Sequence, residues 1–292
     1  MTKKKYIGKV LDPFISPIAK IFLSRKRSGP RPLVIAHRGL PLEFPENTLP
    51  SLMSALREGA DGVEFDLLFS KDNHPYVCHD SDMTAHTSNG REVVNILEMQ
   101  SQEIDALKIY GDYQISSLGS TLAELGTANP KRLYIHYKVE NEVGSEINHI
   151  KAVERAIRQA GLEEIAVVMV ESGRIEPWIS QAPRVQILQC WVGLPGEEGR
   201  YAIDDSRQFN LNHFGFYAKK PRGRGARELN NLGFKRLALY YGSYEYYRYL
   251  SSINGKSVIF TVNDPEWMDL CINAGFTEIG TDNPKLLISK SQ

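Results

Sequence analysis

The chain has 292 residues, of which 42% are hydrophobic, and its 35 basic residues balance its 35 acidic residues. This length and composition support one sizeable globular domain, and the zero net charge argues against a general nucleic-acid-binding surface. Its cysteines, Cys78, Cys190 and Cys271, are odd in number and set in apolar runs. They predict buried thiols rather than disulfides or a zinc motif, and a reducing, cytoplasmic location.

Residues 1–31 form a basic, amphipathic N-terminal segment. Lysines precede an apolar stretch that contains Phe14 and Phe22, and basic residues follow it. Pro13 and Pro17 interrupt the stretch, which is too short and broken to span a membrane, and it lacks a typical signal-peptide cleavage site. The pattern indicates either peripheral attachment to an anionic membrane or a tail that packs on the domain or is disordered.

The first predicted strand is the apolar run 33–36, which suits a strand buried on both faces. His37 then emerges at its carboxyl end, where parallel α/β folds place their chemistry. A helix is predicted over 48–58, with Asn47 as its N-cap and Gly59 at its end, because apolar residues recur there at helical spacing.

The second predicted strand, 62–68, alternates so that Glu64 and Asp66 point to the same face. Two carboxylates turned into an apolar interior are costly unless they are protonated or matched by a cation. A divalent metal is the simplest match: Mg²⁺ or Ca²⁺ prefers oxygen ligands, and Mn²⁺ also accepts imidazole. The alternative is a solvated strand edge or a salt bridge to Arg38 or Lys138.

Strand-like and helix-like stretches alternate beyond residue 130. Strands are predicted near 133–139, 165–170, 185–190, 236–241, 257–262 and 277–280. Helices are predicted near 146–160, 174–181, 226–233, 243–253 and 265–274. With the two early strands this makes eight, and a further run at 213–217 makes the segment 193–225 either a long βα loop or a misread element.

Short motifs follow one another along residues 33–284. They are His37-Arg38-Gly39, Pro45-Glu46-Asn47-Thr48, Gly59-Ala60-Asp61, Glu64-Phe65-Asp66, Lys71-Asp72, His79-Asp80, Phe260-Thr261-Val262-Asn263-Asp264 and Gly280-Thr281-Asp282-Asn283-Pro284. In their order and spacing these motifs resemble those of the glycerophosphodiester phosphodiesterase family.

The resemblance implies a single-domain (β/α)8 TIM barrel over 32–290, a divalent cation, and hydrolysis of a phosphodiester to an alcohol and a phosphomonoester. It implies that His37 and His79 are the catalytic acid and base and that Glu64 and Asp66 bind metal. It also implies that Arg38 contacts the phosphate, and we assign Lys138, near the end of the predicted strand 133–139, to substrate binding as well. Imidazoles titrate near neutral pH, so one ring can withdraw a proton while the other donates one.

One position departs from the family's pattern. Where the family usually has a third metal-binding glutamate, two residues before a lysine, this chain has His136, while the lysine is retained as Lys138. Period-two alternation places both on one face of the third strand. As a metal ligand, His136 favours Mn²⁺ or Zn²⁺ over Ca²⁺. Alternatively, it weakens the metal site and the activity with it.

These observations predict a metal-dependent phosphoric diester hydrolase of lipid and glycerol metabolism that releases an alcohol and glycerol phosphate from small-molecule glycerophosphodiesters. Two alternatives stay open. One is a lysophospholipase D-like activity on lysophospholipids, and the other is a catalytically weakened phosphodiester-binding protein. A glycosidase that uses Glu64 and Asp66 is disfavoured, because that chemistry does not call for two histidines and an arginine.

Overall fold

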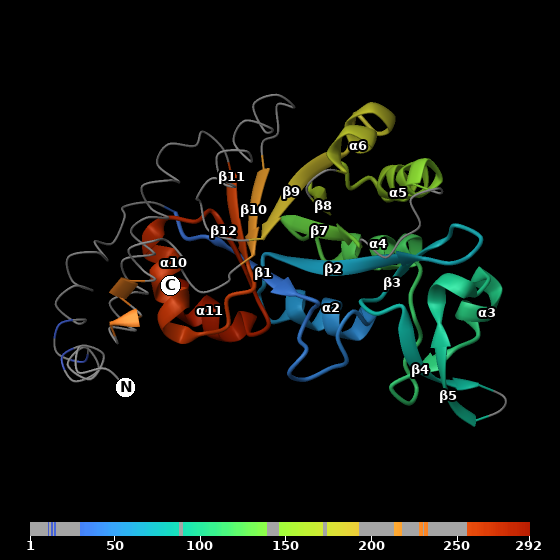
Figure 1. Cartoon of the computed structure of the whole chain (residues 1–292), viewed down its shortest axis with the longest axis horizontal. Coiled ribbons are helices and arrows are strands. Elements are labelled where there is room, and N and C mark those ends of the chain that lie inside the picture. Colours follow the sequence, from blue (N-terminus) through green and yellow to red (C-terminus); the bar gives the residue numbers. More distant parts are fainter. Residues whose placement is uncertain are drawn as a thin grey trace. The chain divides into compact units, whose positions relative to one another are not determined.

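The computed structural model describes residues 11, 13, 15, 30–87, 90–138, 146–171, 174–192, 213–217, 228–229, 231–232 and 256–292. They fall into two compact units (Figure 1). The N-terminal unit comprises residues 34–189 and 280–285, and the C-terminal unit comprises the described residues of 1–33, 190–279 and 286–292.

A parallel sheet with helical connections forms the N-terminal unit (Figure 1). Four adjacent strands, in spatial order, are β1 (Leu33–His37), β2 (Gly62–Phe69), β7 (Arg132–Tyr137) and β8 (Ala166–Glu171), and β9 (Gln186–Val192) follows β8. All eight residues of β2 are buried, as expected for a strand of a parallel sheet that is covered on both faces. The strands predicted at 33–36, 62–68, 133–139, 165–170 and 185–190 are confirmed to within two residues at each end.

The connecting helices are α2 (Leu49–Arg57), α4 (Leu118–Thr127), α5 (Glu146–Ala160) and α6 (Ile175–Gln181). Those predicted at 48–58, 146–160 and 174–181 are therefore confirmed. The predicted N-cap of α2 is wrong. Thr48 is the N-cap, because its hydroxyl accepts a hydrogen bond from Ser51 N at 3.4 Å. Asn47 has a left-handed backbone (φ 56°) and turns its side chain elsewhere.

Residues 70–117, here called the excursion, separate β2 from α4 and contain several elements that the sequence pattern did not predict. They are β3 (Pro75–Val77), β4 (Asp82–Thr87), β5 (Gly90–Asn95), the 3-10 helix η1 (Ile96–Glu98), α3 (Ser101–Asp105) and β6 (Lys108–Ile109). β3 pairs antiparallel with β2, and β4 lies between β5 and β6 in a separate three-stranded sheet. The excursion buries its own apolar cluster, which includes Met83, Ile96 and Ile104.

The C-terminal unit contains three consecutive parallel strands, β10 (His213–Tyr217), β11 (Lys256–Phe260) and β12 (Glu278–Thr281). Its helices are α10 (Pro265–Ala274), which Asp264 caps through Trp267 N at 2.9 Å, and α11 (Pro284–Ser291). The strands predicted near 257–262 and 277–280 and the helix at 265–274 are confirmed.

The sequence assignment between residues 193 and 241 requires a correction. A strand at 236–241 was expected to precede 257–262, but β10 hydrogen-bonds directly to β11 over its whole length. The run at 213–217 is therefore a sheet strand, and the segment 193–225 is not one long βα loop. Residues 236–241 and 243–253, half of 226–233 and most of 1–31 lie outside the described residues.

The three cysteines are confirmed as free, buried thiols. Among the residues that the structure describes, none lies in a helix with the length and apolar character needed to cross a bilayer.

Candidate functional site

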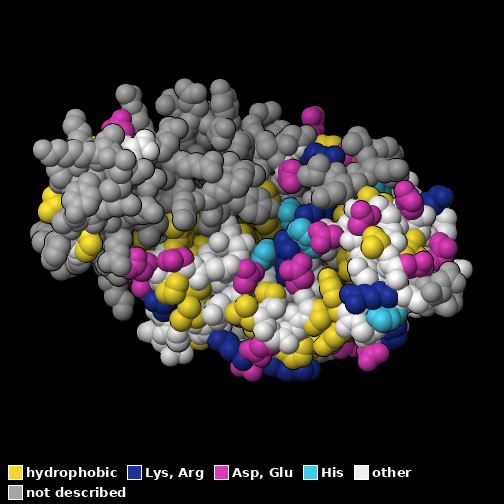
Figure 2. Space-filling view, turned by 60° about the horizontal axis from the view of Figure 1, so that its bottom comes forward, with side chains coloured by type: hydrophobic (Ala, Val, Ile, Leu, Met, Phe, Trp, Pro, Cys, Tyr) yellow, Lys and Arg dark blue, Asp and Glu magenta, His cyan; other side chains and the backbone are white. Residues whose placement is uncertain are grey.

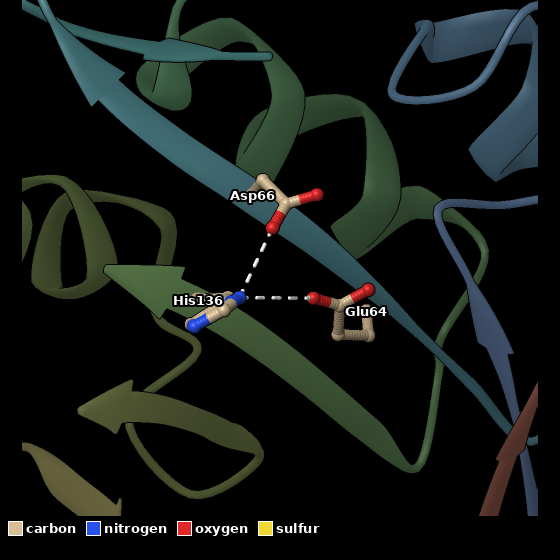
Figure 3. Close-up of side chains that lie close together, drawn as sticks. All are labelled: Glu64, Asp66 and His136. Carbon is tan, nitrogen blue, oxygen red and sulfur yellow. Dashed lines mark hydrogen bonds and ion pairs between the residues drawn. The ribbon is translucent and has the colours of Figure 1, made fainter. Parts of the chain in front are cut away.

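The register of three parallel strands brings the predicted site residues together. His37 at the end of β1 lies beside Glu64 of β2, and Asp66 of β2 lies beside His136 of β7. Side chains at paired positions of adjacent parallel strands project from the same face of a sheet. Glu64, Asp66 and His136 therefore each place one potential ligand atom within 4.8 Å of the other two (Figure 3).

Glu64 and Asp66 are almost completely buried, at 2% and 1% side-chain exposure. Nδ1 of His136 donates to Asp66 Oδ1 at 3.0 Å and lies 3.9 Å from Glu64 Oε1 (Figure 3). Burial and the charge of Asp66 raise the pKa of Glu64. Burial also acts to raise the pKa of Asp66, but the hydrogen bond and charge of His136 and the charge of Arg38 outweigh it, so that pKa is lowered. An added cation beside these two carboxylates would favour ionisation of both.

His37 lies between two carboxylates. Its Nδ1 donates to Asp282 Oδ1 at 2.6 Å, and its Nε2 lies 3.8 Å from Glu64 Oε2. Burial lowers the pKa of His37, but Glu64 and the hydrogen bond to Asp282 outweigh burial, and the net pKa is raised. Asp282 belongs to the Gly280–Pro284 motif, but no local pattern indicates what it contacts, because 245 residues separate it from His37.

Arg38 is held in a left-handed turn (φ 57°) that also places Gly39 at φ 90°. Its Nε lies 3.0 Å from Asp66 Oδ2, and its Nη1 donates to Glu46 Oε1 at 3.0 Å. Ser51 of α2 fixes the turn, because its hydroxyl donates to Arg38 O at 3.2 Å and accepts from Leu40 N at 2.8 Å. A Cβ on Gly39 would lie 2.5 Å from the Ser51 carbonyl carbon, so only glycine fits against the helix.

Asn47 makes two hydrogen bonds to Asp66, a role that the sequence pattern did not reveal. Its Nδ2 donates to Asp66 Oδ2 at 3.0 Å, and its Oδ1 accepts from Asp66 N at 3.0 Å. The left-handed backbone of Asn47 directs its amide toward β2. Pro45-Glu46-Asn47-Thr48 thus supplies a partner for Arg38, a clamp for Asp66 and the cap of α2.

His79 reaches the site from the loop after β3. Its Nδ1 donates to Asp80 Oδ1 at 2.6 Å, and its Nε2 lies 3.2 Å from Lys138 Nζ, which is 4.0 Å from Asp66 Oδ1. All seven predicted site residues are therefore linked by short contacts. Figure 2 shows the corresponding gathering of histidine, basic and acidic side chains near the middle of one face.

The ligand atoms of Glu64, Asp66 and His136 suit a divalent ion. Two carboxylates and one imidazole form a donor set that Mn²⁺ accepts readily. Around this set, Arg38 and Lys138 supply positive charge for a phosphate group, and the histidines supply groups that transfer protons near neutral pH.

Comparisons with known proteins agree with this arrangement. The model of the Glycerophosphoryl diester phosphodiesterase family matches residues 37–174, a segment that contains all seven site residues. Glycerophosphodiester phosphodiesterase domain-containing protein 5 of Gallus gallus is 34% identical over 91 residues, 30% of this chain and 15% of that protein. The glycerophosphodiester phosphodiesterase of Caldanaerobacter subterraneus subsp. tengcongensis is 28% identical over 138 residues, 47% of this chain and 56% of that protein. The chain thus spans about half the length of the bacterial relative and a smaller share of the chicken protein.

Solved structures share the fold. An Oleispira antarctica phosphodiesterase, solved in complex with the product sn-glycerol-3-phosphate, has a TM-score of 0.67 at 19% identity, covering 89% of this chain and 96% of that one. A putative glycerophosphoryl diester phosphodiesterase from Silicibacter pomeroyi has a TM-score of 0.65 at 19% identity, covering 94% and 98%. The motifs, the family model over residues 37–174 and the fold agree, and this part of the chain is similar to the glycerophosphodiester phosphodiesterase family.

Proposed function

We propose that this protein is a metal-dependent phosphoric diester hydrolase that cleaves glycerophosphodiesters to an alcohol and glycerol phosphate. One observation carries the proposal: two histidines border the buried carboxylates, and Nδ1 of each ring is hydrogen-bonded to an aspartate at 2.6 Å. His37 Nε2 lies 3.8 Å from Glu64, and His79 Nε2 lies 3.2 Å from Lys138, which is 4.0 Å from Asp66. The match to the family model over residues 37–174 and the product bound in the similar Oleispira antarctica structure support the substrate class.

The fold that we propose is a (β/α)8 TIM barrel over residues 32–290, preceded by the tail 1–31. Each unit contributes consecutive parallel strands, β1, β2, β7 and β8 in one and β10, β11 and β12 in the other, and β9 supplies the eighth. His37, His136 and Lys138 lie at or just after the carboxyl ends of β1 and β7, where barrel enzymes carry their active sites. Glu64 and Asp66 lie within β2, at positions paired with His37 and His136.

Glu64, Asp66 and His136 are the proposed metal ligands. To bind an ion through Nδ1, His136 must be neutral with its proton on Nε2. When bound, the divalent ion supplies positive charge that stabilises the phosphoryl oxygens as negative charge develops on them. Arg38 and Lys138 bind the phosphate from the protein side, and Asn47 and Glu46 keep Asp66 and Arg38 in place.

The two histidines divide the proton transfers. As the free hydroxyl of the glycerol group or a water molecule attacks phosphorus, one ring accepts its proton at Nε2. The other ring donates a proton from Nε2 to the departing alkoxide as the bond between phosphorus and oxygen breaks. When the glycerol hydroxyl is the nucleophile, the first product is a cyclic glycerol phosphate, and water then opens it to glycerol phosphate while the two rings exchange roles. Asp282 and Asp80 hold the opposite nitrogens, so both rings present Nε2 to the reaction.

The experiment is release of free choline from glycerophosphocholine and from lysophosphatidylcholine, each with Mg²⁺, Ca²⁺, Mn²⁺ or EDTA. We expect release from glycerophosphocholine that EDTA abolishes and that Glu64→Gln lowers by about 10² or more. Faster release from the lysolipid would favour the lysophospholipase D-like alternative. No release with any ion, together with intact binding of glycerophosphocholine, would favour the phosphodiester-binding alternative that His136 raises.

The tail and the location are also proposals. The basic, amphipathic residues 1–31 favour a cytoplasmic protein that contacts anionic membranes peripherally. The full chain should then co-sediment with phosphatidylserine vesicles at low salt and be released by salt, whereas a deletion that starts at Arg31 should not sediment. Equal sedimentation of the two proteins would rule out the tail as the anchor.

A further inference from the structure

A cavity of about 510 Å³ opens beside His79, within the N-terminal unit. Its wall is formed by His79 and Asp80, by the loop before α2, and by β4, β5 and the turn after β6 of the excursion. This volume lies in the range of sites that hold small ligands. None of the three proposed metal ligands lines the cavity, whereas His79 both lines it and contacts Lys138. His79 therefore stands between the phosphate-binding groups and the cavity.

The charge of the cavity wall is predominantly negative. Three carboxylates, those of Glu46, Asp80 and Asp82, line it, and Arg91 is the one Lys or Arg among its described lining residues. Glu46 is already paired with Arg38 at 3.0 Å, and Asp82 accepts a hydrogen bond from Asn95 at 2.7 Å, so these carboxylates have fixed positions. A fixed, net negative wall favours a cationic ligand over a neutral or anionic one.

Tyr110 supplies an aromatic surface at the same wall. It has a left-handed backbone (φ 49°), which is uncommon for a bulky residue, and Gly111 follows at φ 96°. Two backbone hydrogen bonds between Ile109 and Tyr113, at 2.7 and 3.1 Å, hold this turn. The Tyr110 side chain remains 54% exposed, although burial together with the charges of Glu46 and Asp80 raises its pKa. The ring thus lies near carboxylates and open to a ligand, which is the setting of a cation–π contact.

We propose that this cavity receives the alcohol that leaves phosphorus and that it selects alcohols with an ammonium group, through the Tyr110 ring and the carboxylates of Asp80 and Asp82. The inference rests on the proposed hydrolase function, and it assigns that function a substrate class: glycerophosphodiesters of small amino alcohols. Most of the lining is polar, so the cavity does not suit a long apolar alcohol.

The test compares kcat/KM for glycerophosphocholine with kcat/KM for glycerophosphoglycerol, whose leaving alcohol is neutral. We expect the wild type to prefer the choline ester by about fivefold or more. Tyr110→Leu should lower this preference about two- to thirtyfold, whereas Tyr110→Phe, which keeps the ring, should retain most of it. Asp82→Asn should lower it about two- to fivefold. Asp112→Asn is the matched control, because Asp112 is exposed and does not line the cavity.

A second measurement, binding of free choline by saturation-transfer NMR, does not depend on turnover. Choline should give a signal with the wild type and with Tyr110→Phe, and a weaker one with Tyr110→Leu. Equal kcat/KM for both esters in an active wild type would overturn the subsite while leaving the hydrolase function intact. If neither ester is cleaved, the hydrolase function fails, and choline binding then decides the subsite. Absent binding, or binding that Tyr110→Leu does not weaken, would overturn it.

Discussion

The site is assembled from two regions that differ in how firmly they hold their side chains. On the strands, Glu64 and Asp66 are 2% and 1% exposed, and the register of β1, β2 and β7 fixes their neighbours. On the excursion side, His79 is 29% exposed and its partner Asp80 is 69% exposed. These two residues lie in a loop beside a small sheet with its own apolar cluster.

The difference in exposure between the strands and the excursion suits the two regions to different tasks. The two buried carboxylates of β2 and His136 of the adjacent β7 form the proposed metal site. The backbone sets its geometry, because a parallel ladder cannot slip by one residue without moving every side chain to the other face. An exposed loop beside a cavity provides groups that meet the variable part of a substrate. We therefore expect changes on the strands to alter metal binding and changes in the excursion to alter catalysis or selectivity with little effect on the metal.

The largest expected effect comes from the two histidines, one in each region. Because each is proposed to transfer a proton, His37→Ala and His79→Ala should each lower kcat by about 10² or more, and the double variant should lose less than the product of the two effects. The measurement is steady-state hydrolysis of glycerophosphocholine. His74→Ala is the control, since that ring is 61% exposed and pairs with Asp72. Near-wild-type turnover in either single variant would remove this mechanism.

A matched pair of asparagines tests the strand side. Asn47→Ala removes both hydrogen bonds to Asp66 and should lower Mn²⁺ affinity about 10- to 100-fold, as loss of groups that orient metal ligands does elsewhere. Asn95→Ala removes a similar hydrogen bond, to Asp82 in the excursion, and should leave Mn²⁺ affinity nearly unchanged. Isothermal titration calorimetry measures both. Equal losses in the two variants would contradict the separation of the regions.

The identity of the third ligand should set metal preference. With two carboxylates and one imidazole, the wild type should bind Mn²⁺ or Zn²⁺ in preference to Ca²⁺, and His136→Glu should shift the relative affinity toward Mg²⁺ or Ca²⁺ by about tenfold. Calorimetric titration with each ion, paired with turnover, tests this. If the wild type binds no divalent ion, and the variant also binds none and is inactive, the ligand role and the catalytic reading fail together.

The smallest expected effect is on the free energy of unfolding. It concerns a buried histidine that hydrogen-bonds to β7 and to the start of the excursion. His149 accepts from the Tyr137 hydroxyl at 3.0 Å, donates to Asn73 Oδ1 at 2.9 Å and stacks on Phe69 at 3.8 Å between ring centroids. Burial lowers its pKa from 6.5 to about 4. Between these values the unfolded chain gains a proton that the folded protein does not, so the free energy of unfolding should fall as pH falls from 6.5 toward 4.

We expect His149 to contribute about 1–2 kcal/mol to this fall. The measurement is urea unfolding of the wild type and of His149→Phe, which keeps a ring against Phe69. The variant should show a shallower pH dependence, and His86→Gln, an exposed position on β4, should match the wild type. Parallel curves for the wild type and His149→Phe would disprove the role of this ring.

The sequence alone located five parallel strands and three helices of the N-terminal unit outside the excursion, and it nominated the seven residues of the proposed site. Apolar runs and period-two alternation are local signals, so they located β1, β2 and β7 and placed Glu64 and Asp66 on one face. The motif series supplied His79, Arg38 and Lys138. The three predicted buried thiols also followed from local composition.

Tertiary structure alone decided what holds those residues. The hydrogen bond between His37 and Asp282 joins residues 245 positions apart in the chain. The hydrogen bonds between Asn47 and Asp66 depend on the left-handed backbone of Asn47 and on the position of Asp66 in β2. Local patterns carry no information on such pairings, which explains why Asn47 was mistaken for a cap. Nor do they show which strand is the neighbour of β11, because strand order is set by non-local hydrogen bonding. The cavity at Tyr110 arises in the same way, from the packing of the excursion against the loop that precedes α2.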